Sequence, residues 1–94
     1  MDTESRFRAI FAVAYPALGR YALNRGLSRA DAEDLVAATL EIAWRKIDQV
    51  PTDDPIPWLC AVERNLLRNL RRADRRRSSL LSTTIFRTFE FPAR

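Results

Sequence analysis

Residues 55–77 read PIPWLCAVERNLLRNLRRADRRR, and their apolar side chains recur every three or four positions, as on one face of a helix. The spacing predicts a helix from near Pro57 to about Leu80. Its apolar face would comprise Trp58, Leu59, Val62, Leu66, Leu70 and Ala73. Its opposite face would comprise Arg64, Arg68, Arg71, Arg72 and Arg75, with Asn65, Asn69 and Arg76 along the border between the two. We expect such a helix to pack one side against a core and to hold the other in solvent.

A second helix is predicted before this one, from Ser28 to about Ile47. The Ser28 hydroxyl can cap the amide near Asp31, and the following acids lie at the positive end of the helix dipole. The apolar positions cover about half of the circumference, which predicts a helix packed between two others. These positions are Ala32, Leu35, Val36, Thr39, Leu40, Ile42, Ala43 and Ile47. The exposed face is expected to hold Asp34, Ala37, Ala38, Glu41 and Arg45.

A first helix is predicted over about residues 4–25, ending at Gly26 in a left-handed conformation. Its apolar stripe would comprise Phe7, Ile10, Phe11, Ala14, Leu18, Tyr21 and Ala22. Because proline lacks an amide N–H and crowds the preceding turn, we expect a kink or a break at Pro16. Residues 48–57, DQVPTDDPIP, predict a loop stiffened by its prolines between the second and third helices.

These elements predict an all-α fold, a compact bundle of three main helices over residues 1–80, with a linker or tail over residues 81–94. The chain has 94 residues, the size of one domain. It contains no apolar run long enough to span a membrane, and its acidic start is unlike a signal peptide. We therefore expect a cytoplasmic protein.

The scarcity of reactive side chains argues against catalysis. The chain contains no histidine and a single cysteine, Cys60. A zinc site or a histidine-based nucleophile pair is therefore not expected. We predict no enzymatic activity, no metal and no cofactor, with Cys60 an inert small residue near the core.

Charge is concentrated on the third predicted helix, where seven arginines and one acid, Asp74, lie between Arg64 and Arg77. A solvated surface is the ordinary explanation, but such a helix normally alternates its charges. The excess favours contact with a nucleic-acid backbone, and asparagines beside it can address base edges. The candidate DNA-binding residues are Arg64, Asn65, Arg68, Asn69, Arg71, Arg72, Arg75 and Arg76.

The exposed side of the second predicted helix is a candidate docking surface for a protein. Leu40 and Trp44 lie at the edge of its apolar arc, beside acidic residues. A partly exposed leucine and tryptophan are typical of a protein interface, although the acids alone would also serve solubility.

Two segments together resemble the promoter-melting domain of extracytoplasmic-function sigma factors. They are AEDLVAATLEIAWRKID at 32–48 and PIPWLCAVERNLLRNLRRADRRR at 55–77. The family pattern reads approximately as "AEDLVQETFLRAW", a loop, "WLxxIARN" and a basic run. The opening RFRAIFAVAYPALGRYALNRGL, with Pro16, resembles the first helix of that family. The resemblance covers about residues 6–80.

The resemblance implies a division of roles. The second helix would dock on the clamp coiled coil of the largest RNA polymerase subunit, with Asp34 at a matching position. The following loop and the third helix would open the −10 promoter element and hold bases of the non-template strand, with Asn65 matching the end of "IARN" and Asn69 following one turn later. The polymerase-binding candidates are Asp34, Ala37, Ala38, Leu40, Glu41 and Trp44. An anti-sigma factor is a further possible partner.

The sequence departs from the family at two points. Ala37 and Ala38 replace the Gln-Glu pair that contacts polymerase, and the helix-turn-helix that reads the −35 element is not present in the chain. We therefore expect either a fragment of a longer factor or a lone domain acting with another protein. The favoured function is recognition and melting of the −10 element together with polymerase. A protein-interaction module that binds polymerase or a partner factor, and a nonspecific nucleic-acid-binding bundle, are the alternatives.

Overall fold

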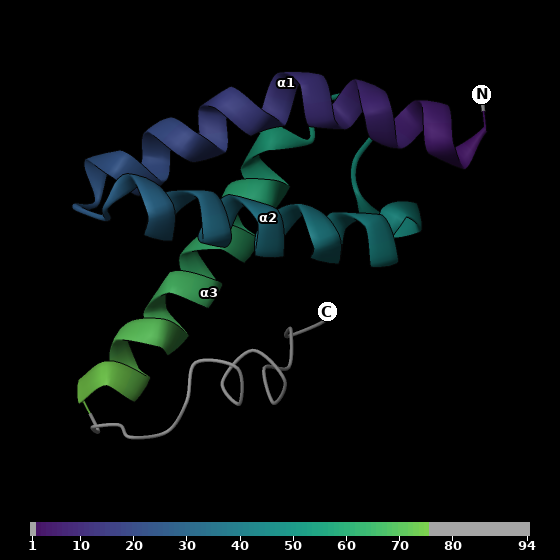
Figure 1. Ribbon diagram of the computed structural model, residues 1–94. Coiled ribbons are helices and arrows are strands. Elements are labelled where there is room, and N and C mark those ends of the chain that lie inside the picture. The colour runs from purple at the N-terminus through teal and green to yellow at the C-terminus, as the bar shows by residue number, and fades with distance from the viewer. Residues whose placement is uncertain (1, 76–94) are drawn as a thin grey trace.

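The computed structural model describes residues 2–75, which form three α-helices and one short 3₁₀ helix. These are α1 (Thr3–Asn24), α2 (Arg29–Arg45), η1 (Ile47–Gln49) and α3 (Ile56–Arg75). The helices α1 and α2 lie side by side and antiparallel, and α3 crosses behind them and contacts both (Figure 1). The all-α bundle predicted from the sequence is confirmed. The predicted end of the third helix near Leu80 and the domain boundary after it lie outside the described residues.

The first helix is capped at its start and passes unbroken through its proline. The Asp2 carboxylate accepts a hydrogen bond from the Ser5 amide at 2.8 Å, which satisfies one of the free N–H groups of the first turn. Pro16 lies inside the helix, so of the expected kink or break the break does not occur. Both Pro16 and Ala12, whose carbonyl has lost its N–H partner, are exposed, and water can satisfy that carbonyl.

The turn between α1 and α2 has the predicted form. Gly26 has a φ of 93°, a left-handed conformation that a side chain would disfavour. Ser28 then begins α2, and its hydroxyl accepts a hydrogen bond from the Asp31 amide at 3.1 Å. This tight turn places the end of α1 directly beside the start of α2.

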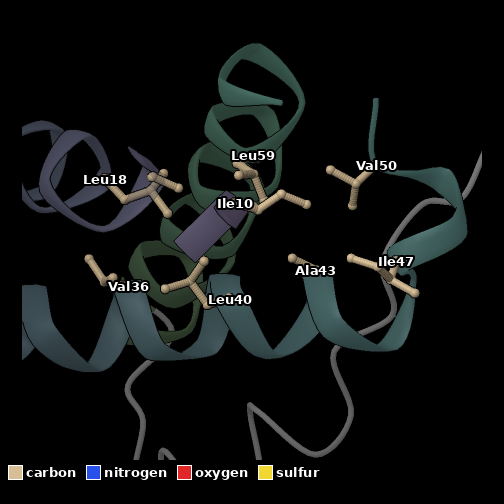
Figure 2. Close-up of a cluster of buried hydrophobic side chains, with 9 residues drawn as sticks. Ile10, Leu18, Val36, Leu40, Ala43, Ile47, Val50 and Leu59 are labelled. Atoms are coloured by element: carbon tan, nitrogen blue, oxygen red, sulfur yellow. The ribbon is translucent and has the colours of Figure 1, made fainter. Parts of the chain in front are cut away.

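The core consists of two clusters, one toward each end of the bundle. The first joins all three helices with the loop after α2 (Figure 2), and it comprises Ile10, Ala14, Leu18, Val36, Leu40, Ala43, Ile47, Val50 and Leu59. The second comprises Ala22, Ala32, Leu35, Val62, Leu66 and Leu67. The half-buried Trp58 packs against both clusters. The wide apolar arc of α2 is explained because both α1 and α3 pack against it.

Two predicted positions need correction. Phe11, assigned to the apolar stripe of α1, is 41% exposed and stacks on Tyr15 with ring centroids 5.3 Å apart. Leu67, which lies outside the predicted apolar face of α3, is buried in the second cluster. None of the helices within residues 2–75 combines the length and apolar character of a membrane span.

Candidate nucleic-acid interface

One face of α3 is built almost entirely of arginine. Arg64, Arg68, Arg71 and Arg72 are exposed, while Leu59, Val62 and Leu66 on the opposite face are buried. The two-faced helix predicted from the sequence is therefore present. Arg75 belongs to the helix, but its side chain and all of Arg76 lie outside the described part of the chain.

The arginines of this face have no acidic partner among the described residues. The ion pairs found within residues 2–75 are Arg8 with Glu4 on α1 and Arg45 with Glu41 on α2. No carboxylate in that part of the chain pairs with Arg64, Arg68, Arg71 or Arg72. An unneutralised row of guanidinium groups produces a positive potential that attracts phosphates.

Two asparagine side chains lie beside this arginine face. Asn65 and Asn69 are half-buried, one helical turn apart. The Asn65 Oδ1 accepts a weak hydrogen bond from Arg68 Nη1 at 3.5 Å, longer than a typical N–H···O bond. The sequence placed both asparagines at this border. An amide here can offer one donor and one acceptor to a base edge.

The loop before α3 is anchored at both ends. Val50 and Pro55 are buried, whereas Asp53 and Asp54 between them are exposed. Arg6 from the first turn of α1 reaches this loop, donating from Nη1 to the Ile47 carbonyl at 2.8 Å and from Nη2 to the Val50 carbonyl. Sequence reasoning missed Arg6 because its partners lie 41 and 44 residues away.

Most of the residues of the candidate docking face on α2 are exposed. Asp34, Ala37 and Glu41 are exposed, and Trp44 is 46% exposed with its ring 5.2 Å from that of Phe7. Ala38, which is predicted to be exposed, is instead half-buried and packs against the second core cluster.

Leu40 does not lie on the docking face. It is 4% exposed and packs in the first core cluster (Figure 2), so the prediction that it is partly exposed is wrong. The physical reason is that α1 and α3 both pack against α2, which buries the edge of the apolar arc as well as its centre.

A buried acid, Glu63, was missed by the sequence analysis. Its side chain is fully buried, and neither carboxylate oxygen has a hydrogen-bond partner among the described residues. Burial raises the pKa of Glu63 from 4.5 to about 8. Its helical neighbours indicate only that it lies toward the apolar face, because Leu59, Leu66 and Leu67 lie one turn before and after.

Cys60 lies half-buried against the first core cluster. Burial raises the pKa of its thiol, with a smaller contribution from Glu63 nearby. Within residues 2–75, no group of three or more Cys, Asp or Glu side chains is arranged to hold a metal ion.

The fold and this surface define a helical domain with an arginine-rich face suited to a polyanion. A family model described as Sigma-70 region 2 matches residues 10–77, and the chain belongs to that family. Sigma-70 region 2 is a non-enzymatic domain of transcription initiation factors, and in general it binds RNA polymerase and recognises the −10 promoter element. No similar curated protein and no similar solved structure was found.

Proposed function

We propose that the chain is region 2 of an extracytoplasmic-function sigma factor, and that it opens the −10 element by capturing bases of the non-template strand. The observation that carries the proposal is the face of exposed arginines on α3, which have no acidic partner within residues 2–75, with Asn65 and Asn69 beside it. The domain would extend to about residue 80, followed by a linker or tail, and would act with polymerase in the cytoplasm.

In this mechanism holding and reading are separate tasks. The guanidinium groups of α3 hold the phosphates, which supplies affinity without sequence preference. Asn65 and Asn69 then hydrogen-bond the edges of bases that have left the stack, next to the loop that leads into α3. Unstacking costs a few kcal/mol per base, which one or two good base contacts and the phosphate contacts together offset. A domain of this kind binds single strands more tightly than duplex.

The exposed side of α2 is the proposed surface for the clamp coiled coil of polymerase. It offers the exposed carboxylates of Asp34 and Glu41, with Trp44 as an aromatic anchor at the far end of the helix. Ala37 and Ala38 add only small apolar contacts in place of the amide and acid of the family pattern. Polymerase would therefore be held more weakly along the middle of this face than in factors that keep the Gln-Glu pair.

The test of base reading is the variant Asn65→Ala. A preferred strand is first selected from a randomised single-stranded pool and compared with a scrambled strand of the same composition. The variant loses the amide but keeps the charge, so we expect a loss of about 1–3 kcal/mol in binding free energy for the preferred strand only. The slope of affinity against salt concentration stays unchanged.

The control is Asn24→Ala, which removes an exposed asparagine at the end of α1. It should leave the ratio of preferred to scrambled affinity unchanged. If Asn65→Ala also leaves that ratio unchanged, Asn65 does not read bases. If the pool yields no preferred strand at all, the domain is a nonspecific nucleic-acid binder or a protein-interaction module, and binding to the isolated polymerase clamp separates these two.

A further inference from the structure

A cavity of about 200 Å³ lies where the end of α1 meets α3. It is lined by Tyr21, Arg25, Arg64, Leu67, Arg68 and Arg71. We propose that this cavity binds one phosphate group of a nucleic-acid strand, so that α1 takes part in strand binding together with α3. This inference rests on the proposed function and names a specific phosphate site within it.

The lining carries four guanidinium groups and no carboxylate. Arg25 comes from the end of α1, whereas the other three arginines come from successive turns of α3. Within the described residues, none of the four pairs with an acid. Because like charges gathered at one site repel one another, an anion that binds there removes an unfavourable interaction as well as gaining new contacts.

Two contacts hold Arg25 and Arg71 in place where α1 meets α3. Arg71 Nη2 donates to the backbone carbonyl of Arg25 at 2.8 Å. The Arg25 guanidinium lies over the Tyr21 ring, 5.2 Å from its centroid, as a cation–π pair. Each guanidinium has five N–H donors, so Arg71 keeps most of its own for a ligand. Two of the four arginines are therefore held in position before anything binds, which lowers the entropy cost of binding.

The size of the cavity indicates a phosphate within a strand rather than a complete cofactor. At about 200 Å³ it is smaller than the roughly 300–1,000 Å³ of pockets that enclose small-molecule ligands. The Tyr21 hydroxyl is buried, so the donors accessible at the cavity are the guanidinium groups. Arginine forks form a donor set suited to phosphate oxygens.

The cavity adjoins the residue proposed to read a base. Arg68 lines the cavity, and its Nη1 contacts Asn65 Oδ1. A phosphate held in the cavity would fix the position of the strand along α3, and hence which base lies against Asn65. Phosphate contacts commonly set register in this way, without carrying sequence information themselves.

The decisive comparison is between Arg25→Ala and Arg20→Ala, two variants that lose the same charge from α1. Arg20 is exposed and does not line the cavity. The probe is oligothymidylate of about ten nucleotides, a length within the usual range for single-strand sites. We expect Arg25→Ala to weaken binding about tenfold more than Arg20→Ala, the effect of one charge-assisted hydrogen bond. Equal losses would overturn the proposal.

A scan of the probe then locates the phosphate. Each linkage in turn is replaced by a neutral methylphosphonate in the wild-type and Arg25→Ala proteins. If one phosphate occupies the cavity, neutralising that linkage removes most of the difference between the two proteins, and neutralising distant linkages does not. A difference that shrinks equally at every linkage would show that Arg25 acts only through general attraction, and the proposal would be wrong.

Free thymidine monophosphate and inorganic phosphate distinguish the source of the ligand. If either binds in competition with oligothymidylate and as tightly, the cavity is a site for a free anion and not for a strand. Arg25→Lys, which keeps the charge without the planar fork, should lose part of the affinity while keeping the wild-type melting temperature. Oligothymidylate carries no preferred sequence, so failure of base reading at Asn65 would leave all of these results unaffected.

Discussion

At the scale of single residues, Glu63 has the most unusual environment in the described chain. Its carboxyl group lies fully buried in α3 without a hydrogen-bond partner, and its pKa is raised to about 8. The raised pKa follows from burial, because a charged carboxylate is far less favourable than the neutral acid where water is excluded. The protein therefore folds most favourably with Glu63 protonated.

This environment predicts a fall in stability as pH rises. The unfolded chain releases the Glu63 proton near pH 4.5 and the folded protein near pH 8, so the folded state holds more protons between these values. The free energy of unfolding should fall by up to about 1.4 kcal/mol per pH unit across this window and level off above it. Urea unfolding from about pH 5 to about pH 9 measures the slope.

The variant Glu63→Gln should remove that slope, because it cannot ionise. It should unfold at higher urea than wild type above pH 8 and show little advantage below pH 4.5. Glu33→Gln, at an exposed position of α2, provides the control and should keep the wild-type slope. A slope that persists in Glu63→Gln would assign the pH dependence to another group.

The helical register of Glu63 could be predicted from the sequence, but its burial could not. Its spacing to Leu59 and Leu66 places it toward the apolar face, whereas composition suggests an acid that pairs with the neighbouring arginines. Whether Glu63 is buried or pairs with an arginine depends on how closely α1 and α2 pack against that turn. Leu40 was misjudged for the same reason, since its exposure is set by the crossing of the other helices.

At the scale of elements, α1 combines an interior proline with an unbroken helix. Pro16 removes one backbone hydrogen bond, and its position on the exposed side limits the cost. Pro16→Ala should restore that hydrogen bond and stabilise the protein by about 1–3 kcal/mol. Part of this gain is offset, because proline also stabilises the folded state by reducing the conformational entropy of the unfolded chain. Thermal unfolding by circular dichroism measures the change.

The matched control is Pro57→Ala in the first turn of α3. The amide at that position has no intrahelical partner, so proline is tolerated there and its removal should give no stabilisation. Equal gains at the two prolines would show that the backbone hydrogen bond at Pro16 is not the cause.

Periodicity and capping residues predicted the helices well, because Ser28, Gly26 and the apolar spacing act within a few residues.

At the scale of the whole molecule, contacts between distant segments shape the candidate site, and the sequence did not predict them. The cavity joins Arg25 of α1 to Arg71 of α3, which are 46 residues apart. The sequence predicted the arginine face of α3 because periodicity determines which residues share a face. It could not predict the contribution of α1, because that depends on where the two helices cross. Arg6 is a second example, at the opposite end of α1.

Arg6 ties the start of α1 to the loop that leads into α3. Its guanidinium donates to the carbonyls of Ile47 and Val50 and, at 3.3 Å, to the Thr52 hydroxyl. These bonds satisfy backbone groups in a segment that has only a short 3₁₀ helix of its own. We therefore infer that Arg6 sets the conformation of the loop proposed to lie beside the captured bases.

Arg6→Met keeps much of the side-chain stem but removes all of these hydrogen bonds. It should lower the free energy of unfolding by about 1–3 kcal/mol, because the bonds involve a charged, partly buried donor. Amide exchange at Val50, whose N–H bonds to the Ile47 carbonyl at 3.2 Å, should accelerate more than exchange in the middle of α2. Arg8→Met removes the same charge and only an exposed ion pair with Glu4, so it should change stability by less than about 0.5 kcal/mol. If the two variants behave alike, the loop is held by its own buried Val50 and Pro55, and a strand captured there would be positioned without help from α1.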